Sequence, residues 1–342
     1  MLDFSSILAK LSDGSSLTIE QSEATFEQIM SGGVDPMQLS AFLMALRVRG
    51  ETVEEIIGGA KVLRNRVLTL NAPAQAVDTC GTGGDGIGTY NISTAAAIVT
   101  AAAGAVVAKH GNRSVSSKSG SADVLKALGA SFDIEVADHE ESLKKFGFTF
   151  MFAPSHHHAM KHVAPVRSAL KLRTIFNLIG PLSNPAKTRN QILGVYDKRW
   201  VRPMAEVLQA LGSDHVWVVH GEDGLDELTV TGKTLVAELK GGTITEFEVH
   251  PRDAGLPLSS LESLKGGEAE ENARAITALL NGETSSYRDI VVFNSAAALL
   301  VSGVVENLVQ GAKRASAAID SGKARILLDD WIKFTNLKSA GQ

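Results

Sequence analysis

The sequence contains very little cysteine, and Cys80 is the only one among its 342 residues. A single thiol cannot form a disulfide framework within the chain, which fits a reducing compartment. The sequence also lacks an apolar run long enough to cross a bilayer, because the Ala-rich stretch 95–108 is short and is interrupted by Gly104. The first residues lack the basic segment and long apolar run of a signal peptide. We therefore expect a cytoplasmic globular protein.

An excess of positive charge is missing as well. The 33 Lys and Arg residues are outnumbered by 38 Asp and Glu residues, which gives a net charge of −5. Nucleic-acid-binding proteins usually carry a basic excess, so this balance argues against that class. A chain of 342 residues is too long for one ordinary core, and we expect one large domain or two smaller ones.

The first seventy or so residues carry start and stop signals of helices and no strand pattern. Asp35 and Pro36 can begin a helix that runs to about Arg49. Thr52 and Glu55 have the spacing of a capping box at the start of the next helix. The pattern predicts a small domain made only of helices.

From residue 77 onward, short apolar runs alternate with helical patterns, which predicts a largely parallel sheet covered by helices. Segment 163–182 looks helical again and is expected to pack on the first domain, and segment 231–250 alternates like an antiparallel hairpin. We therefore predict an α/β fold: a small N-terminal all-helical domain and a larger α/β domain with a mostly parallel central sheet. The strand-like runs are 77–80, 105–110, 148–152, 191–196, 215–221 and 289–294.

A glycine-rich loop, DTCGTGGDGIGTYNIST, lies at residues 78–94 between a predicted strand and a predicted helix. Glycines let a backbone approach an anion closely and present its N–H groups, and the helix N-terminus adds further donors. The glycines satisfy the G-x-G-x-x-G pattern of dinucleotide sites, but the helix begins too late and no acidic residue lies between Asp85 and Asp123. A Walker A loop is excluded because no Lys-Ser/Thr follows the glycines. A flexible turn is the plain alternative, and a phosphate or pyrophosphate site fits the polar residues better.

A second loop of the same kind, KHGNRSVSSKSGSADVLKALG, covers residues 109–129. It follows a buried strand, leads into a helix, and places Lys109, His110, Asn112 and Arg113 at the strand's carboxyl end, where parallel sheets bind ligands. A solvated loop with a serine cap is the alternative interpretation. Two such loops after adjacent strands converge on one crevice, which favours a binding site.

These two segments, together with MFAPSHHHAMKHVAPVRSALKLRTIFNLIGPLSNP (151–185) and GLDELT (224–229), resemble the signature motifs of the anthranilate phosphoribosyltransferases. The resemblance covers most of the chain. It implies an enzyme of tryptophan biosynthesis that transfers phosphoribose from 5-phosphoribosyl 1-pyrophosphate (PRPP) to the amine of anthranilate. It also implies the fold that nucleoside phosphorylases share with this family, and a homodimer formed through the helical domain. We expect a helical domain at 1–72 joined by helices from about 163–186, and a PRPP-binding α/β domain at 73–162 and 187–342.

The resemblance also implies the roles of individual residues. Mg²⁺ is expected on Ser93, Asp226 and Glu227, and hard oxygen ligands of this kind suit that ion. Anthranilate is expected at Gly81, His110, Asn112, His157 and Arg167, with Arg167 meeting the carboxylate. PRPP is expected at Gly81, Gly84, Asp85, Thr89, Asn91, Ile92, Ser93, Thr94, Lys109, His110, Gly111, Asn112, Arg113, Ser114, Val115, Ser116, Ser117 and Ser121.

No side chain is expected to act as a strong general base, because the anthranilate amine is already neutral at pH 7 and needs positioning instead. Lys109 and backbone amides would neutralise charge on the departing pyrophosphate. Cys80 is expected to be a small residue at a strand end and not a nucleophile.

The sequence departs from the family pattern at two positions near the acceptor. His158 stands where the family usually has proline, and Lys171 stands where it usually has glycine. His158 and His162 have the spacing of one helix face, which raises a transition-metal alternative, but no cysteine or zinc-hydrolase glutamate accompanies them. Two other functions stay open: a pyrimidine nucleoside phosphorylase of similar fold, and a non-enzymatic relative that binds nucleic acid.

Overall fold

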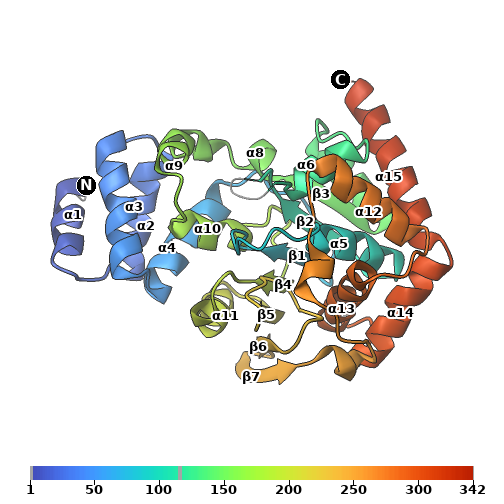
Figure 1. Cartoon of the computed structure of the whole chain (residues 1–342). Helices are drawn as coiled ribbons and strands as arrows, with labels where there is room; N and C mark the ends of the chain where they lie inside the picture. The colour runs from blue at the N-terminus through green and yellow to red at the C-terminus, as the bar shows by residue number, and fades with distance from the viewer. Residues whose placement is uncertain (1–2, 115–117, 342) are drawn as a thin grey trace.

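The computed structural model describes residues 3–114 and 118–341, in which an N-terminal helical bundle stands beside a larger α/β unit (Figure 1). Among the helices that it describes, none combines the length and the apolar character needed to traverse a bilayer. The bundle contains α1 (Phe4–Ser12), α2 (Ile19–Met30), α3 (Pro36–Arg49) and α4 (Val53–Arg66), and it is joined by α9 (Ala164–Leu170) and α10 (Ile175–Ile179).

The predicted helix boundaries of the bundle are confirmed by their caps. The Asp35 side chain accepts from the N–H of Met37 at 2.8 Å, and Pro36 occupies the first turn of α3, where its missing N–H costs nothing. Thr52 and Glu55 form the predicted reciprocal capping box at the start of α4. Local chemistry therefore fixes where these helices begin.

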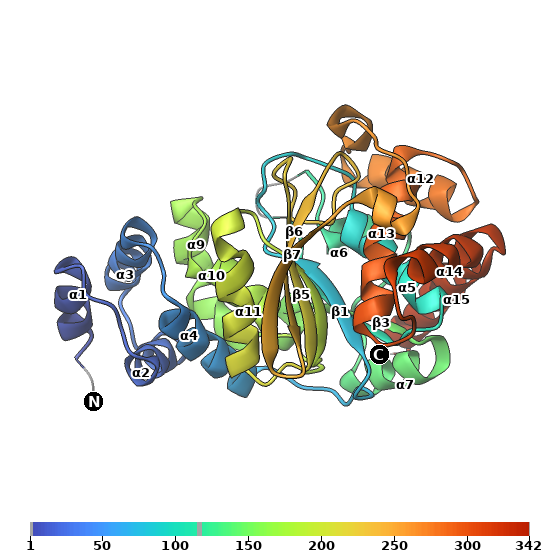
Figure 2. The same cartoon turned by 90° about the horizontal axis from the view of Figure 1, so that it is seen from below.

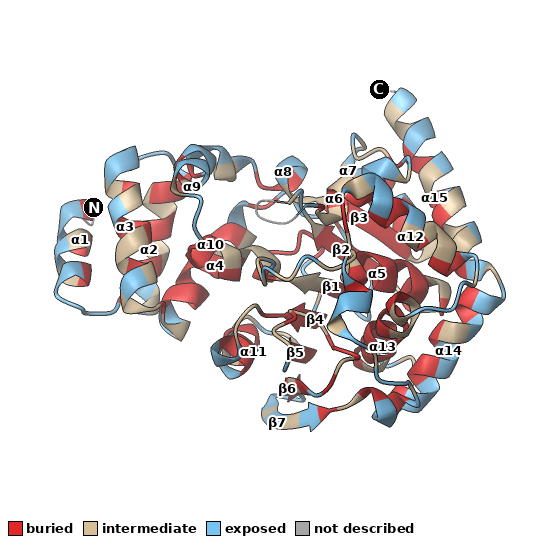
Figure 3. Ribbon diagram, viewed as in Figure 1, coloured by how far each residue is buried: buried red, intermediate tan, exposed pale blue. Residues whose placement is uncertain are grey.

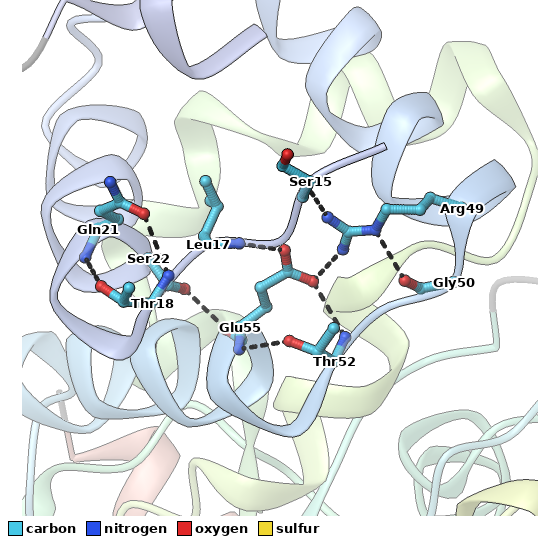
Figure 4. Close-up of polar contacts among 9 residues, drawn as sticks. All are labelled: Ser15, Leu17, Thr18, Gln21, Ser22, Arg49, Gly50, Thr52 and Glu55. Carbon is cyan, nitrogen blue, oxygen red and sulfur yellow. Dashed lines mark hydrogen bonds and ion pairs between the residues drawn. The ribbon is translucent and has the colours of Figure 1, made fainter. Parts of the chain in front are cut away.

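Glu55 is also the buried polar centre of the bundle (Figure 4). Its carboxylate pairs with the guanidinium of Arg49 and accepts from the N–H groups of Leu17 (2.9 Å) and Thr52 (3.0 Å). One side chain thus ties together the α1–α2 loop, the end of α3 and the start of α4. A buried charge is tolerated there because its oxygens are paired and hydrogen-bonded.

A seven-stranded sheet, counted over the described ranges, forms the centre of the α/β unit, with the order β3-β2-β1-β4-β5-β6-β7. The first five of these strands are parallel, and β6 and β7 add an antiparallel hairpin at one edge. The predicted mostly parallel sheet and the predicted hairpin are both confirmed. The strands are β1 (Val77–Gly81), β2 (Val107–Gly111), β3 (Phe148–Phe152), β4 (Asn190–Gly194), β5 (His215–Gly221), β6 (Thr234–Lys240) and β7 (Thr243–Val249).

Helices cover both faces of the sheet, as the second view makes plain: α11 lies on the side of the bundle, and α5 and α13 lie on the other (Figure 2). The remaining helices are α5 (Ile92–Ala102), α6 (Ser121–Ala127), α7 (Val136–Phe146), α8 (Ala153–His156), α11 (Val201–Ala210), α12 (Ala269–Leu280), α13 (Ser286–Val301), α14 (Leu308–Asp320) and α15 (Lys323–Ala340). Short 3₁₀ helices are η1 (His158–His162), η2 (Gly180–Leu182), η3 (Lys198–Trp200), η4 (Pro251–Ala254) and η5 (Leu261–Leu264).

The strand predicted at 289–294 is wrong, because this segment lies inside α13. The helix is packed against α5 and α14, and nearly every residue from Tyr287 to Leu299 is buried. A helix buried all round has no polar face, so its sequence carries no 3.6-residue alternation and reads like a buried strand.

The interior divides into two large apolar clusters, one on each face of the sheet. Along β5, Val216 and Val218 point into one cluster, whereas Trp217 and Val219 point into the other. The first cluster continues through α11 and α10 into the helical bundle, where Phe26 meets Phe176 with their ring centres 5.7 Å apart. Buried residues accordingly run from the bundle to the sheet (Figure 3), so segment 163–182 does pack on the bundle as predicted.

Candidate active site

A cavity of about 830 Å³ opens where the parallel strands β1 and β2 end, at Gly81 and Gly111. Ligands of parallel sheets bind at this edge because the loops that follow neighbouring strands meet there. The opposite wall comes from the bundle side and includes Leu63, Met160 and Phe176. The cavity therefore lies between the two parts of the molecule.

The structure brings nearly all the predicted site residues to this one cavity. Thr94 is an exception: it is fully buried behind the wall, and its hydroxyl hydrogen-bonds to Ser121 Oγ at 3.0 Å. Val115, Ser116 and Ser117 lie outside the described residues. The predicted residues that line the cavity are Gly81, Gly84, Asp85, Thr89, Asn91, Ile92, Ser93, Lys109, His110, Gly111, Asn112, Arg113, Ser114, Ser121, His157, Arg167, Asp226 and Glu227.

The glycine loop takes a path that side chains would obstruct. Gly83 and Gly84 have φ angles of 64° and 76°, a region that other residues rarely adopt. A Cβ at Gly81 would lie 3.0 Å from the carboxyl carbon of Asp226, and one at Gly194 would lie 2.5 Å from the Asp226 carbonyl carbon. The Gly83 N–H donates to Asp226 Oδ2 at 2.8 Å. Glycine is therefore required both for the turn and for the close approach of Asp226.

The N-terminus of α5 meets the second carboxylate of the pair. The Ser93 N–H donates to Glu227 Oε1 at 3.1 Å, so this carboxyl group provides an acceptor for an amide of the first turn that has no partner within the helix. Lys109 is only 1% exposed, and its ammonium group donates to the Thr79 carbonyl and lies 3.5 Å from Ser93 Oγ. The cation expected to face pyrophosphate thus lies in the floor of the cavity, within a cluster of fixed acceptors.

The acidic pair carries more negative charge than its surroundings offset. Burial and the neighbouring charge of Asp85 raise the pKa of Asp226 to about 7, and burial with the charge of Asp226 raises the pKa of Glu227 to about 8. Burial also raises the pKa of Asp85, and Lys109 counteracts the shift at Glu227. Crowded carboxylates with raised pKa values are what a divalent cation stabilises on binding. The donor set therefore fits Mg²⁺.

The second loop is folded around Asp123 at the start of α6. One Asp123 oxygen accepts from the N–H groups of both Ser114 and Gly120, each at 2.9 Å. Arg113 lies over the ring of Phe152, with 5.7 Å between its guanidinium carbon and the ring centre. Two residues on opposite ends of the loop share one acceptor, so its ends are held together beside the cavity.

The cavity lining also carries Arg167 and two uncharged histidines. Arg167 on α9 lies over the Phe176 ring at 5.6 Å. The rings of His110 and His157 are 5.1 Å apart, and in both the Nε2 atom is buried without a hydrogen-bond partner. Burial lowers the pKa of His157 to about 4 and holds that of His110 well below its usual value. Both rings are therefore uncharged at neutral pH.

Sequence reasoning missed Asn272, a buried residue of α12 that organises both loops. Its side chain accepts from the Gly267 N–H at 2.8 Å and donates to Asn91 Oδ1 at 2.9 Å. Asn91 in turn exchanges two hydrogen bonds of 3.1 Å with Ser119. The predicted phosphate ligand Asn91 is thus engaged as a link between loops. A lone asparagine on an amphipathic helix, 181 residues away, gives no sequence signal.

The transition-metal alternative for the histidines finds no supporting geometry in the described residues, and the surroundings of Cys80 disfavour a thiolate. Within 3–114 and 118–341, no group of three or more His, Cys, Asp or Glu side chains has metal-binding geometry. His158 and His162 lie on the short 3₁₀ helix η1, not on an α-helix face. Burial raises the pKa of the Cys80 thiol, and its sulfur lies 3.1 Å from the Gln191 amide nitrogen. A protonated thiol is a poor nucleophile.

Comparison with known families assigns the two parts of the chain separately. Residues 5–67 match the helical bundle domain of a glycosyl transferase family, and residues 73–325 match the a/b domain of the same family. The anthranilate phosphoribosyltransferase of Parvibaculum lavamentivorans is 58% identical over 339 residues, which is 99% of each chain.

Solved structures agree with this similarity in fold. The anthranilate phosphoribosyltransferase of Thermus thermophilus superposes with a TM-score of 0.90 at 40% identity, covering 96% of this chain and 99% of that one. The Saccharomyces cerevisiae enzyme in complex with PRPP and Mg gives a TM-score of 0.89 at 29% identity, covering 98% of both chains. The resemblance expected from the motifs is confirmed, and the chain belongs to the anthranilate phosphoribosyltransferase family.

Proposed function

We propose that the protein transfers the phosphoribosyl group of PRPP to the amine of anthranilate, giving N-(5'-phosphoribosyl)anthranilate and pyrophosphate in tryptophan biosynthesis. The observation that carries this function is the meeting of two anion-type loops, an acidic pair and Arg167 in one cavity. Membership of the family over the whole chain supports the same reaction. A cytoplasmic location stays a prediction.

PRPP is assigned to the side of the cavity formed by the two loops. The loop amides and the N-terminus of α5 offer hydrogen-bond donors for phosphate oxygens. Asp226, Glu227 and Ser93 would hold Mg²⁺, which would supply positive charge to the phosphate oxygens of bound PRPP. Lys109, placed in the floor, balances the charge of Glu227. The proposed role of Lys109 is accordingly to add positive electrostatic potential at the pyrophosphate from the floor of the cavity.

Anthranilate is assigned to the bundle side, where Arg167 can pair with its carboxylate. Gly81, Asn112 and the uncharged rings of His110 and His157 line the same cavity. A neutral aromatic amine needs orientation toward the anomeric carbon and not removal of a proton before attack. The site therefore accelerates transfer by holding two substrates together and by stabilising charge on the leaving pyrophosphate.

The direct test is the loss of anthranilate fluorescence when PRPP and Mg²⁺ are added to the protein. We expect the signal to fall with both present and to persist when either PRPP or Mg²⁺ is omitted. Unchanged fluorescence in the complete mixture would refute the proposal. Phosphorolysis of thymidine, or a gel shift with nucleic acid at low salt, would point instead to the two other functions left open by the sequence.

We also propose a homodimer formed through α3. Its exposed face carries Met37, Ala41, Met44 and Val48 at the spacing of one helix stripe, and Met37 and Val48 are each 80% exposed. The helix lies at the end of the molecule that is distant from the sheet (Figure 1). Apolar side chains with that much exposure gain most from burial against a second copy.

A further inference from the structure

The glycine loop is held from two opposite sides. On the sheet side, the Gly83 N–H donates to Asp226, and the Thr82 N–H donates to the Gly194 carbonyl at 2.9 Å. On the bundle side, the Gly84 carbonyl accepts a hydrogen bond from Nη1 of Arg173. Arg173 does not line the cavity, so it contacts the glycine loop on the side that faces away from the cavity.

Arg173 is itself held firmly at the junction of the two parts of the molecule. It lies in the connection between α9 and α10, both of which pack into the core shared with the bundle. Its guanidinium lies over the ring of Tyr196, 4.3 Å from the ring centre, within the range of an effective cation–π contact. The planar group can therefore stack on Tyr196 and donate to Gly84 at the same time.

Tyr196 provides a fixed platform because its own position is determined twice. Its hydroxyl accepts from the Trp200 indole N–H at 3.0 Å, and its backbone N–H donates to Thr82 Oγ1 at 3.0 Å. Thr82 belongs to the glycine loop. The glycine loop, Tyr196 and the α9–α10 connection thus form one closed set of contacts.

A glycine loop needs such an external hold. Gly83 and Gly84 both have positive φ and no side chains to restrict rotation of the peptide between Gly84 and Asp85. In a trans peptide the C=O and the next N–H point in opposite directions, so holding the Gly84 carbonyl also sets the direction of the Asp85 N–H. Without a partner for that carbonyl, the loop amides would sample several orientations.

Resting on the proposed function, we propose that Arg173 is a positioning residue for the reaction: its stack on Tyr196 and its hydrogen bond to Gly84 fix the loop that receives PRPP. Arg173 lies outside the residues that line the cavity. Arg173 raises the fraction of protein molecules in which the amides of the glycine loop are already oriented for the pyrophosphate. Because Arg173 belongs to the α9–α10 connection, this orientation depends on the packing of the helical bundle against the α/β unit.

The test compares Arg173→Ala with Arg199→Ala. Arg199 also lies over an aromatic ring, that of Trp200 at 5.2 Å, and its side chain forms an ion pair with Asp197 and not a hydrogen bond to the glycine loop. We expect Arg173→Ala to raise the KM for PRPP on the order of 10–100-fold, with the anthranilate KM changed less than about twofold. Arg199→Ala is expected to match the wild type. An unchanged PRPP KM in Arg173→Ala, or equal changes for both substrates, would overturn the proposal.

Further variants separate a positioning role from a loss of folding. Arg173→Lys keeps the charge and a donor, so it should recover part of the PRPP affinity. Tyr196→Leu removes the aromatic ring and should weaken PRPP binding as Arg173→Ala does, whereas Tyr196→Phe keeps the ring and the backbone contact with Thr82 and should weaken binding less. The double variant of Arg173→Ala and Tyr196→Leu should be no weaker than either single variant. Fully additive losses would contradict a shared role.

Equilibrium binding of PRPP with Mg²⁺ distinguishes this inference from the proposed function. If the wild type binds PRPP but consumes no anthranilate, the proposed reaction is refuted. The role of Arg173 can then still be tested by comparing the PRPP affinities of the wild type and Arg173→Ala. If the wild type is active and Arg173→Ala binds PRPP with wild-type affinity, only the positioning role fails.

Discussion

The side-chain nitrogen of Asn272 lies 2.9 Å from Oδ1 of Asn91 and donates a hydrogen bond to it. The direction is set by the backbone, because the oxygen of Asn272 already accepts from the Gly267 N–H. Asn91 must therefore turn its own amide nitrogen toward the Ser119 carbonyl. Through this relay, α12 fixes the relative placement of the two loops that border the cavity.

Changing Asn272 to Asp should damage PRPP binding although the side chain keeps its shape. The new carboxylate would face the Asn91 oxygen without a donor, at a cost of about 1–3 kcal/mol. We expect the KM for PRPP to rise about 10-fold by steady-state kinetics, as a loss of about 1.4 kcal/mol would give. Asn336→Asp, which alters an exposed asparagine that donates to the Gly129 carbonyl, is the matched control. Equal kinetics for the two variants would disprove the relay.

Arg167 and Arg113 should separate the two substrates. Arg167→Ala removes the proposed partner of the anthranilate carboxylate, so it should raise the anthranilate KM by about 10-fold or more, since charge-assisted bonds contribute about 1.5–3 kcal/mol. Arg113→Ala should chiefly raise the KM for PRPP. Each variant serves as the control for the other. Unchanged anthranilate kinetics in Arg167→Ala would show that the acceptor is bound elsewhere.

The buried carboxylate of Glu55 should make a large contribution to stability. Glu55→Gln leaves Arg49 without its charged partner and is expected to lower the free energy of unfolding by about 3 kcal/mol in denaturant titrations. Glu23 and Lys61 form an exposed pair in the same bundle, with 2.7 Å between their charged atoms. Glu23→Gln should therefore cost less than about 1 kcal/mol. Similar losses for both variants would mean that burial does not set the difference.

His139 should make the protein acid-sensitive. Burial lowers its pKa from 6.5 to about 4, while the charges on His156 add a smaller effect in the same direction. Between these two values the unfolded chain binds more protons than the folded one, so the free energy of unfolding falls as pH drops from 6.5 toward 4. From pH 6.5 to 5 this one group accounts for about 2 kcal/mol. The loss is complete only below pH 4.

His139→Gln tests that contribution, because an amide can still hydrogen-bond to Thr149 but does not titrate. The histidine Nδ1 lies 2.9 Å from Thr149 Oγ1. We expect the variant to lose about 2 kcal/mol less than the wild type between pH 6.5 and 5 in matched denaturant titrations. Parallel pH curves for the two proteins would assign the acid sensitivity to other groups.

The proposed dimer should dissociate when the α3 stripe becomes charged. Met37→Glu and Val48→Glu together would place two carboxylates in an apolar interface, where unpaired charges are strongly disfavoured. Light scattering coupled to size exclusion should then report half the wild-type mass. Leu337, 74% exposed on α15, offers a control at the other end of the molecule. A wild type that is already monomeric, or a dimer that persists in the double variant, would refute this interface.

Sequence patterns predicted the parts of the fold and site that depend on local chemistry. The two anion-type loops were recognisable because glycines, helix starts and strand ends lie within short segments of the chain. The strand predicted at 289–294 is wrong because a helix without a polar face carries no helical period. Arg173 and Asn272 could not be found at all, because each acts through a contact with a segment distant in sequence.

Some residue roles were predicted only from the resemblance to the family and not from the residues themselves. Arg167 alone would pass for a surface arginine, and only the fold brings it to the cavity. Lys171, at a position where the family usually has glycine, has a φ of 50° at the end of α9, a conformation that glycine adopts without strain. The domain division at residues 72, 163 and 186 stays a prediction, supported by the core that α9 and α10 share with the bundle.

Gly194 shows how a residue with no chemistry of its own can be indispensable. Its missing side chain leaves room for the backbone of Asp226, and even a methyl group there would displace that strand-to-loop contact. In a saturation scan of growth without tryptophan, position 194 should therefore tolerate no replacement, as strictly as the acidic pair itself. Such a scan alone would count Gly194 among the ligand-binding residues, whereas its role is to leave room for the backbone of Asp226.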